Sequence, residues 1–440
     1  MRSATASSPR ALIIAEAANP DWPSVPLVGW SHAAALARVA DVHVVTQVRN
    51  RDSFVRSGWR EGVDFTAIDS EAAARPLWHF DQALRSLTGL GWTTTTALSA
   101  LPYYYFEHLV WKTFAKRIQS GEFSIVHRLT PLSPTSPSII ANRCKQAGAK
   151  FIWGPINGGV PWPKGFDQVR RAEGEWLSYV RDAYKLLPGY RSTRADAAAI
   201  LVGSLATRDQ LSPEGRDKAI YIPENAIDPA RFGRKVDRPV TTPLRVAFVG
   251  RLVPYKGADM LIEAAAPLVK EGRLVVDVIG DGPEMPRLQR LVQELDVAGG
   301  VKLDGWVPNT MLQERLVASD VFGFPSVREF GGGAVLEAMA LGLAPVVVDY
   351  GGPAELVTET TGFRVPLGTR EEIIARVRVV LGKLAAEPAR ARAIGERARA
   401  RVFSLFTWDH KARQTLAVYS WVRGEGPRPD FGAPFPDGVA

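Results

Sequence analysis

Short runs of apolar, often β-branched residues alternate along the chain with longer segments whose apolar positions recur at helical spacing. The runs that predict strands are Ala11–Ala15, Val42–Thr46, Ser124–His127, Lys150–Trp153, Ala198–Gly203, Arg245–Gly250, Leu274–Gly280, Val321–Pro325 and Ala344–Val348. Clear helical patterns cover Ser31–Val39 and Ala258–Lys270. Strands that alternate with helices are typical of parallel sheets covered by helices, so the pattern predicts an α/β protein with doubly wound parallel sheets.

A polar segment that contains proline, residues 234–243, separates two such alternating halves, and we interpret it as an interdomain linker. We therefore expect an N-terminal domain at residues 1–235 and a second domain at residues 243–406. The segment 425–440 is rich in glycine and proline, which predicts an extended tail.

Composition narrows the class of protein. With 440 residues and 46% hydrophobic residues, the chain can bury a sizeable core in each of two domains. Its single cysteine, Cys144, allows no internal disulfide, which fits a reducing cytosol. The apolar stretch near the N-terminus is too short for a secretory signal, and no run reaches the roughly 18 to 20 apolar residues that span a bilayer. We expect a cytoplasmic protein.

The formal net charge of +8 is unevenly distributed. Residues 1–240 contain 30 Lys and Arg against 22 Asp and Glu, whereas residues 241–440 contain 24 of each kind. No nucleic-acid-binding motif accompanies the excess. A solvated basic surface and contact with an anionic membrane or a lipid-phosphate acceptor both remain as interpretations, and the second would place the protein at the inner face of the cell membrane.

The stretch E-F-G-G-G-A-V-L-E, from Glu329 to Glu337, carries the clearest chemistry. Three glycines, Gly331, Gly332 and Gly333, open into a helical pattern, so backbone N–H groups at a helix N-terminus can receive an anion. The two carboxylates can accept hydrogen bonds from hydroxyl groups. A phosphate combined with several hydroxyls describes a sugar nucleotide.

This stretch resembles the E-x7-E signature of retaining glycosyltransferases of the GT-B fold, in particular glycosyltransferase family 4. Further motifs follow the order of that family's donor-binding domain across about 120 residues, Leu244 to Phe363. They are G-R-L-V-P-Y-K-G with Arg251 and Lys256, V-I-G-D-G-P with Asp281, L-D-G-W-V-P with Val307, and V-V-V-D-Y-G-G-P-A-E-L-V. The resemblance implies two Rossmann-like domains that face a central cleft.

The resemblance also implies roles for individual residues of the second domain. Arg251 and Lys256 would hold the donor diphosphate and stabilise the leaving group, as two cations suit a diphosphate. Glu337 would bind the ribose hydroxyls, and Glu329 the hydroxyls of the transferred sugar. Phe330 and the three glycines would line the sugar and phosphate, and Asp281 and Val307 would lie near the base. The alternatives are a surface basic pair, a helix-surface carboxylate and ordinary turn residues.

In the first domain, the resemblance concerns three places. Gly29, before a helical pattern, is similar to a glycine loop that faces the donor phosphate. His127, at a strand end, is similar to a histidine that faces the donor sugar, although a lone histidine is as often structural. W-G-P-I-N-G-G-V-P-W-P, from Trp153 to Pro163, resembles a loop of some of these enzymes. The helix at about 407–424 resembles the family's C-terminal helix, which returns to complete the first domain.

No D-x-D triplet and no cluster of histidine and cysteine occurs in the sequence. Metal-dependent transferases bind a divalent ion through carboxylates at the diphosphate. Because Arg251 and Lys256 can supply the positive charge instead, we expect no metal and no cofactor other than the nucleoside diphosphate sugar, which is a co-substrate.

The segment Leu98–Ile118 is a candidate for membrane contact. Trp111, Phe114 and Ile118 share one face of its helical pattern, and Lys112 and Lys116 lie elsewhere around it. Such a helix suits an interfacial contact. The alternative is a helix packed on the core of the first domain.

The sequence thus predicts a retaining hexosyltransferase that uses a nucleoside diphosphate sugar, with uridine diphosphate favoured and guanosine diphosphate mannose next. The acceptor would be a glycan or lipid-linked hydroxyl in polysaccharide or glycolipid biosynthesis. Two alternatives remain: a sugar-nucleotide epimerase of the same fold, and a non-catalytic nucleotide-binding homologue.

Overall fold

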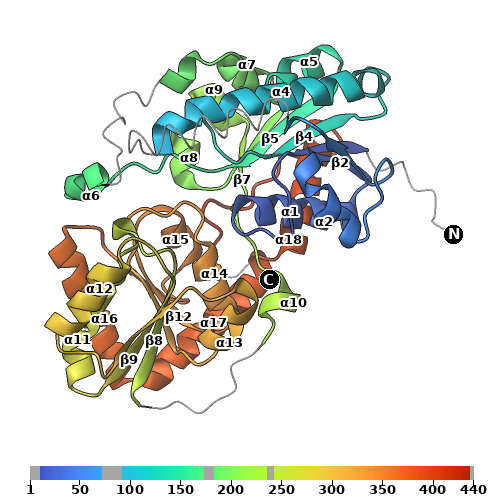
Figure 1. The fold of residues 1–440 in the computed structure, drawn as a ribbon. Helices are drawn as coiled ribbons and strands as arrows, with labels where there is room; N and C mark the ends of the chain where they lie inside the picture. The colour runs from blue at the N-terminus through green and yellow to red at the C-terminus, as the bar shows by residue number, and fades with distance from the viewer. Residues whose placement is uncertain (1–9, 72–91, 173–182, 235–241, 437–440) are drawn as a thin grey trace. The chain divides into compact units, whose positions relative to one another are not determined.

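The computed structural model describes residues 10–71, 92–172, 183–234 and 242–436 (Figure 1). The chain divides into two compact units. Unit 1 comprises residues 1–159, 170–224 and 408–431, and unit 2 comprises residues 160–169, 225–407 and 432–440. Two short pieces that the sequence placed in the first domain, 160–169 and 225–234, thus fall in unit 2. Most of the expected linker lies outside the described residues.

The core of unit 1 is a seven-stranded parallel sheet with the strand order β3-β2-β1-β4-β5-β6-β7. The strands are β1 (Ala11–Ala15), β2 (Val42–Gln47), β3 (Phe65–Ile68), β4 (Ile125–Thr130), β5 (Lys150–Ile156), β6 (Ala199–Val202) and β7 (Ala219–Tyr221). Every residue of β1 and β4 is buried. Strands buried on both faces often read as continuous apolar runs, as β1 does, whereas β4 also buries His127 and Arg128.

Helices cover both faces of this sheet. They are α1 (Val25–Val39), α2 (Arg51–Arg56), α4 (Trp92–Gln119), α5 (Ile140–Gln146), α7 (Tyr190–Asp196), α8 (Leu205–Asp209), α9 (Pro213–Asp217) and α18 (Trp408–Val422), and α6 (Asp167–Ala172) spans a boundary between the units. The red helix α18 lies beside the blue helix α1 (Figure 1), and Nε2 of His32 lies 3.1 Å from Oγ1 of Thr415. The C-terminal helix therefore completes the first unit.

Unit 2 is built on a six-stranded parallel sheet with the order β10-β9-β8-β11-β12-β13. Its strands are β8 (Leu244–Val249), β9 (Leu274–Ile279), β10 (Val301–Gly305), β11 (Val321–Phe324), β12 (Ala344–Val348) and β13 (Phe363–Val365). The strand order reverses between β8 and β11. In doubly wound sheets, ligands bind beyond the carboxyl ends of the strands at such a switch point, so the loops that follow β8 and β11 are the place to look for a site.

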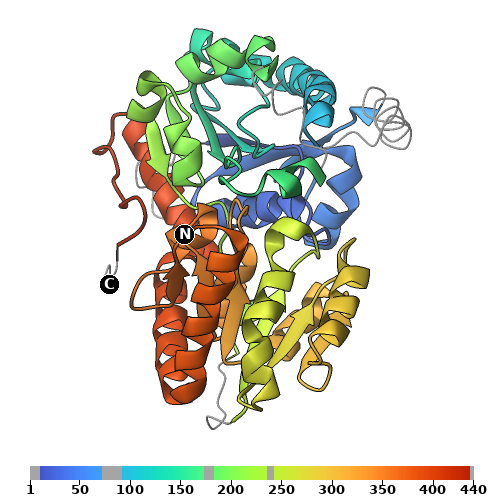
Figure 2. The same cartoon turned by 90° about the vertical axis from the view of Figure 1, so that its left-hand side faces the viewer.

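The helices of unit 2 are α10 (Pro229–Phe232), α11 (Ala258–Lys270), α12 (Met285–Glu294), α13 (Asn309–Leu316), α14 (Gly333–Ala340), α15 (Gly351–Leu356), α16 (Arg370–Ala386) and α17 (Pro388–Leu405). Helix α11 packs against α16 on one face of the sheet, and α14 packs against α17 on the other (Figure 1). Figure 2 turns toward the viewer the side of unit 2 on which Figure 1 labels α11 and α16.

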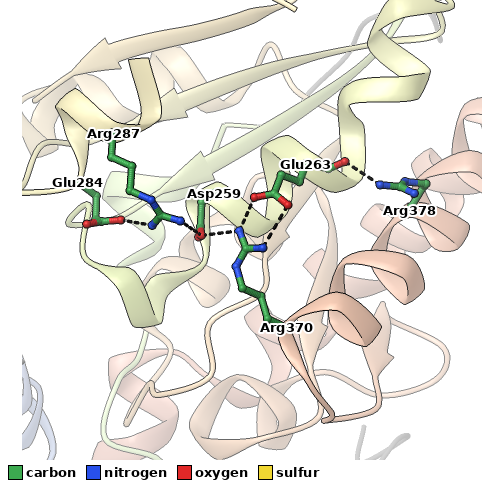
Figure 3. A network of polar contacts seen from close by, with 6 residues as sticks. All are labelled: Asp259, Glu263, Glu284, Arg287, Arg370 and Arg378. Carbon is green, nitrogen blue, oxygen red and sulfur yellow. Dashed lines mark hydrogen bonds and ion pairs between the residues drawn. The ribbon is translucent and has the colours of Figure 1, made fainter. Parts of the chain in front are cut away.

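An ionic network joins three of these helices (Figure 3). Arg370, at the start of α16, contacts Asp259 at 2.8 Å and also pairs with Glu263, both on α11. Arg287 of α12 contacts the same Asp259 at 3.2 Å and Glu284 at 2.5 Å. The side chain of Asp259 is only 7% exposed, so two guanidinium groups neutralise a nearly buried carboxylate. The network therefore fixes α11, which follows directly on the predicted diphosphate loop.

The candidate membrane helix belongs to the core of unit 1. In α4, Phe114 and Ile118 are each 1% exposed, and the ring of Phe114 packs against Phe123. Because Phe114 and Ile118 are covered by the protein itself, this part of the face fits the alternative of a helix packed on the core, and only Trp111 of the predicted face is partly exposed. No helix in the described ranges has both the length and the apolarity that a membrane span requires.

The tail contains no helix or strand in residues 425–436, but its last described part is packed rather than free. Phe435 is 3% exposed, and its ring centroid lies 5.3 Å from that of Phe406. The guanidinium of Arg401 donates to the carbonyl oxygen of Phe435 at 2.6 Å. The expectation of a merely extended tail missed this contact, because single aromatic anchors leave no periodic signal.

Candidate functional site

The centre of the candidate site is an ion pair between Lys256, in the loop after β8, and Glu329, in the loop after β11. Both side chains are 18% exposed, so the pair is largely removed from solvent yet reachable. The ammonium nitrogen also lies 5.3 Å from the ring centroid of Phe324. Burial lowers the pKa of Lys256 to about 8, while the adjacent carboxylate favours the charged form. The structure thus brings together two residues that the sequence predicted separately.

Glycine allows the two loops to approach each other. Gly257 has a φ of +77°, and a Cβ there would lie 2.6 Å from the carbonyl oxygen of Pro325. The loops are also joined directly, because the amide of Val327 donates to the carbonyl oxygen of Tyr255 at 3.0 Å. A side chain at position 257 would push the loops apart, so this glycine is required by close approach as well as by conformation.

A third loop, after β12, contacts the backbone of Glu329. The amide of Gly352 donates to the carbonyl oxygen of Glu329 at 3.1 Å. A Cβ at Gly351, which has a φ of +66°, would lie 2.5 Å from the same oxygen. The backbone of Glu329 is therefore fixed by the G-G-P segment that the sequence analysis placed among the family motifs.

The three glycines of the signature form the start of helix α14. Gly332 is the N-cap residue, with a φ of +63°, and no side chain caps this end of the helix. Its first backbone N–H groups are thus left for solvent or an anion. Phe330 is partly exposed beside Gly331, which is buried.

Glu337 lies in α14, one turn beyond its start. Burial raises the pKa of Glu337 to about 7, and the guanidinium of Arg231 acts in the opposite direction. A carboxylate held in this way is ready to gain hydrogen-bond donors, such as ribose hydroxyls, which would favour its charged form.

Arg251 follows β8 and is exposed, with no hydrogen bond or ion pair to any residue that the structure describes. It is an available cation, in contrast to Lys256. The loop with Asp281 lies alongside, because the amide of Leu252 donates to the carbonyl oxygen of Asp281 at 2.9 Å. The Asp281 carboxylate accepts from the next amide, Gly282, at 2.7 Å, which is turn chemistry. Val307 is partly exposed after edge strand β10, and the structure shows no contact that links it to the ion pair.

Two predicted site residues of the first domain have structural roles instead. His127 is fully buried in unit 1, with Nδ1 2.7 Å from the hydroxyl of Tyr419 and Nε2 2.6 Å from the carbonyl oxygen of Gly154. Both ring nitrogens are occupied, so His127 has no nitrogen left for a sugar. Burial lowers its pKa to about 4. This geometry favours the structural role that was the alternative for His127, and its catalytic role stays a prediction.

Gly29 lies inside α1 rather than in a loop before it. The helix begins at Val25, six residues earlier than the pattern indicated, because Pro26 occupies its first turn, where proline is favoured. A Cβ at Gly29 would lie 2.3 Å from the carbonyl oxygen of Ala17. The glycine is therefore needed for close packing of the helix, and the expectation of a phosphate-facing loop at Gly29 is not met.

The segment Trp153–Pro163 is split between the units. Trp153 to Ile156 belong to β5, and Asn157 is 7% exposed, with its amide nitrogen 2.7 Å from Oε2 of Glu224. From Val160 onward, the chain contacts the loops of unit 2 instead. The sequence analysis gave this segment no role, and it also missed Tyr255 and Arg328, which precede Lys256 and Glu329 directly.

A second polar cluster, also missed, lies in unit 1. Lys411 of α18 is 3% exposed and donates to the carbonyl oxygen of Glu224, and its nitrogen lies 4.5 Å from the ring centroid of Trp408. Burial lowers the pKa of Lys411 to about 7 and raises that of Glu224. Neither residue belongs to a motif, so only the fold brings them together.

Comparison with known proteins identifies a family match for the second half of the chain. Residues 231–401 match the family model for glycosyl transferases group 1. The chain is 35% identical over 202 residues to alpha-maltose-1-phosphate synthase of Mycolicibacterium smegmatis. This alignment covers 44% of this chain and 50% of that protein. It is 34% identical over 241 residues to D-inositol 3-phosphate glycosyltransferase of Kineococcus radiotolerans, covering 50% and 53%. The chain thus spans about half the length of the curated relatives that it matches.

Solved structures share the fold of almost the whole chain. A glycosyltransferase from Rickettsia africae has a TM-score of 0.61 at 14% identity and covers 95% of this chain and 100% of its own. Anabaena HepE in complex with UDP has a TM-score of 0.60 at 16% identity and covers 94% and 100%. The predicted fold class, with two Rossmann-like parallel-sheet units of the GT-B kind, is confirmed. Residues 231–401 are therefore a glycosyl transferases group 1 domain within a chain of GT-B fold.

Proposed function

We propose that the protein is a retaining glycosyltransferase that moves a hexosyl unit from a nucleoside diphosphate sugar to an acceptor hydroxyl. The observation that carries this proposal is the largely buried Lys256–Glu329 pair, together with the start of α14, which no side chain caps. These groups offer a cation, a carboxylate and backbone N–H groups at the switch point of a doubly wound sheet, where nucleotides bind. The matched domain and the names of the relatives point in the same direction.

Each of these protein groups can be assigned to one part of a bound sugar nucleotide. Arg251, Lys256 and the N–H groups at Gly332 and Gly333 would hold the diphosphate, whose negative charge grows as it leaves. Cations placed there stabilise the transition state more than the ground state. The carboxylate of Glu329 would bind hydroxyls of the sugar and balance the positive charge that develops at its ring. Glu337 would accept hydrogen bonds from the ribose.

The reaction needs no protein nucleophile. The bond from the anomeric carbon to the phosphate oxygen breaks, and the acceptor oxygen bonds to that carbon on the same face. The departing phosphate oxygen takes the proton of the acceptor hydroxyl, so the configuration is retained. Because two cations and a helix N-terminus already face the diphosphate in this assignment, we propose that transfer proceeds without a metal ion.

For the donor we favour a uridine diphosphate sugar, with guanosine diphosphate mannose next. Anabaena HepE, which shares the fold, has structures with UDP and with UDP-glucose. For the acceptor we propose a glycan or lipid-linked hydroxyl in polysaccharide or glycolipid biosynthesis. The excess of positive charge in residues 1–240 supports an anionic acceptor or contact with the inner face of the cell membrane.

The test is NMR of the purified protein with a panel of nucleotide sugars and a chelator, without acceptor. We expect slow release of free sugar and nucleoside diphosphate from one donor, and no release by the Glu329→Gln variant. Conversion to a new sugar nucleotide would instead identify an epimerase. If no donor reacts and calorimetry detects no binding of UDP or GDP, the proposed function is wrong.

A further inference from the structure

Residues 160–169 belong to unit 2, although the strand that precedes them belongs to unit 1. Val160 is 1% exposed and Phe166 is 4% exposed. A connecting segment on a protein surface normally leaves its apolar side chains in contact with solvent. The burial of these two side chains shows that the segment is packed against a defined surface.

Within this segment, Trp162 contacts the chain neighbour of each member of the ion pair. Its ring centroid lies 5.9 Å from that of Tyr255, at an angle of 86°. The guanidinium carbon of Arg328 lies 4.7 Å from the centroid of the same ring. Tyr255 directly precedes Lys256, and Arg328 directly precedes Glu329. One indole therefore touches both loops that carry the pair.

Arg328 contacts a second aromatic ring in addition to Trp162. Its guanidinium lies over Trp162 on one side and 5.6 Å from the ring centroid of Phe330 on another. A cation held on aromatic faces is attracted by each ring. Because Arg328 and Phe330 flank Glu329 in the chain, holding their side chains fixes the backbone from which Glu329 projects.

A second anchor holds the segment itself. The hydroxyl of Tyr350 donates to the carbonyl oxygen of Pro161 at 2.6 Å. Cγ1 of Val160 lies 3.8 Å from the place that a Cβ of Gly351 would occupy. The loop after β12 thus supports both Glu329, through Gly352, and the segment that carries Trp162.

We propose that Trp162 is a positioning residue that sets the geometry of the Lys256–Glu329 pair. The contacts of Trp162 stand independently, but the catalytic consequence rests on the proposed function. Misplacing a reacting group by about 1 Å reduces rates by about 100-fold. Loss of the indole should therefore reduce turnover without removing any group that touches the donor.

The experiment compares Trp162→Ala, Trp162→Phe and Val379→Ala, the last an exposed position of α16 in the same unit. Two readouts are used: kcat and KM for the reacting donor, and hydrogen exchange of the ligand-free protein at the amides of Val327 and Gly352. These amides bond to Tyr255 and Glu329 and so report the geometry of both loops without any activity.

We expect Trp162→Ala to lower kcat/KM by about 10- to 100-fold, mainly in kcat, and to speed exchange at both amides. Trp162→Phe, which keeps a ring for Arg328, should stay within about threefold of the parent protein, and Val379→Ala should match it. If Trp162→Ala behaves like Val379→Ala in both readouts, the proposal is wrong. Faster exchange in a protein that neither turns over a donor nor binds UDP or GDP would support the positioning role while refuting the proposed function.

Should Trp162→Ala fail to fold, Tyr350→Phe decides the question, because it removes only the hydroxyl that holds Pro161. We expect a smaller fall in kcat, with KM unchanged, and faster exchange at Gly352. Unchanged kcat and unchanged exchange in this variant would refute the proposal.

Discussion

At the scale of single residues, the two glutamates of the E-x7-E signature have different surroundings in the structure. Glu329 lies beside a cation, whereas Glu337 lies in a helix with its charge disfavoured by burial. The first is therefore paired with the ammonium group of Lys256. The second has a pKa of about 7 and changes its charge near neutral pH.

This difference gives a prediction for pH dependence. Because the folded pKa of Glu337 is raised, the stability that its protonated form provides is complete below about pH 4.3 and is lost as the pH rises through about 7. We expect Glu337→Gln to be about as stable as the parent protein at pH 5. At pH 8 it should be more stable, by about 1 to 3 kcal/mol, since each pKa unit is worth about 1.4 kcal/mol and the side chain is partly exposed.

The measurement is thermal unfolding of both proteins from pH 5 to 8, together with calorimetry of UDP binding. Hydroxyl donors favour the ionised carboxylate, so the affinity of the parent protein for UDP should rise with pH through about 7, and that of Glu337→Gln should not. A stability difference that shrinks as the pH rises would show that burial does not govern this group.

The places of residues could be predicted from the sequence only where a motif sets backbone and side chain together. Lys256, Glu329 and the signature glycines belong to local motifs, and the structure places them at one switch point. His127 and Gly29 were assigned by resemblance, each from a short stretch at a strand or helix end, but their surroundings depend on residues outside those stretches, Tyr419 and Ala17. Nothing near these residues in the sequence indicates those contacts.

At the scale of elements, the ionic network of Figure 3 ties α11, α12 and α16 together through Asp259. Replacing Arg370 by methionine leaves Asp259 with Arg287 alone and removes the pair with Glu263. We expect a loss of about 1 to 3 kcal/mol in unfolding free energy, between the values typical of exposed and buried pairs. Thermal unfolding at low and high salt measures it.

The matched control is Arg390→Met, in α17, whose partner Glu387 is 66% exposed and 3.8 Å away. This change should cost less than about 1 kcal/mol. Equal losses for the two variants would mean that the Asp259 network contributes no more than an ordinary surface pair.

Elements were predictable from the sequence in proportion to their burial. The central strands β1, β9, β11 and β12 were predicted within about a residue, and α11 was predicted with its exact bounds. The four strands that were missed, β3, β7, β10 and β13, are the four edges of the two sheets. Edge strands are short or partly exposed, so they lack the long apolar run that marks a strand buried on both faces.

At the scale of the whole molecule, the chain returns to unit 1 after completing most of unit 2. Helix α18 supplies Tyr419 to His127 of β4 and Thr415 to His32 of α1. We expect Ala417→Pro, within α18, to disrupt this helix at a cost of about 3 kcal/mol. Hydrogen exchange should then become faster in β1 and β4, while β8 and β9 keep their protection.

The mirror control is Val379→Pro, within α16, which should accelerate exchange in unit 2 and leave β1 and β4 unchanged. If both prolines loosen both sheets equally, the chain unfolds as one cooperative body and the division into units carries no energetic meaning.

The return of α18 also sets the order in which a nascent chain can mature. The ribosome releases the strands of unit 1 first, but the helix whose Tyr419 hydroxyl hydrogen-bonds His127 emerges only after residue 407. By then, nearly all of unit 2 has left the exit tunnel. Most of the later half of the gene can therefore fold before the earlier half is complete. In the interval, β4 and α1 lack their cover, which makes the half-made chain a client for chaperones.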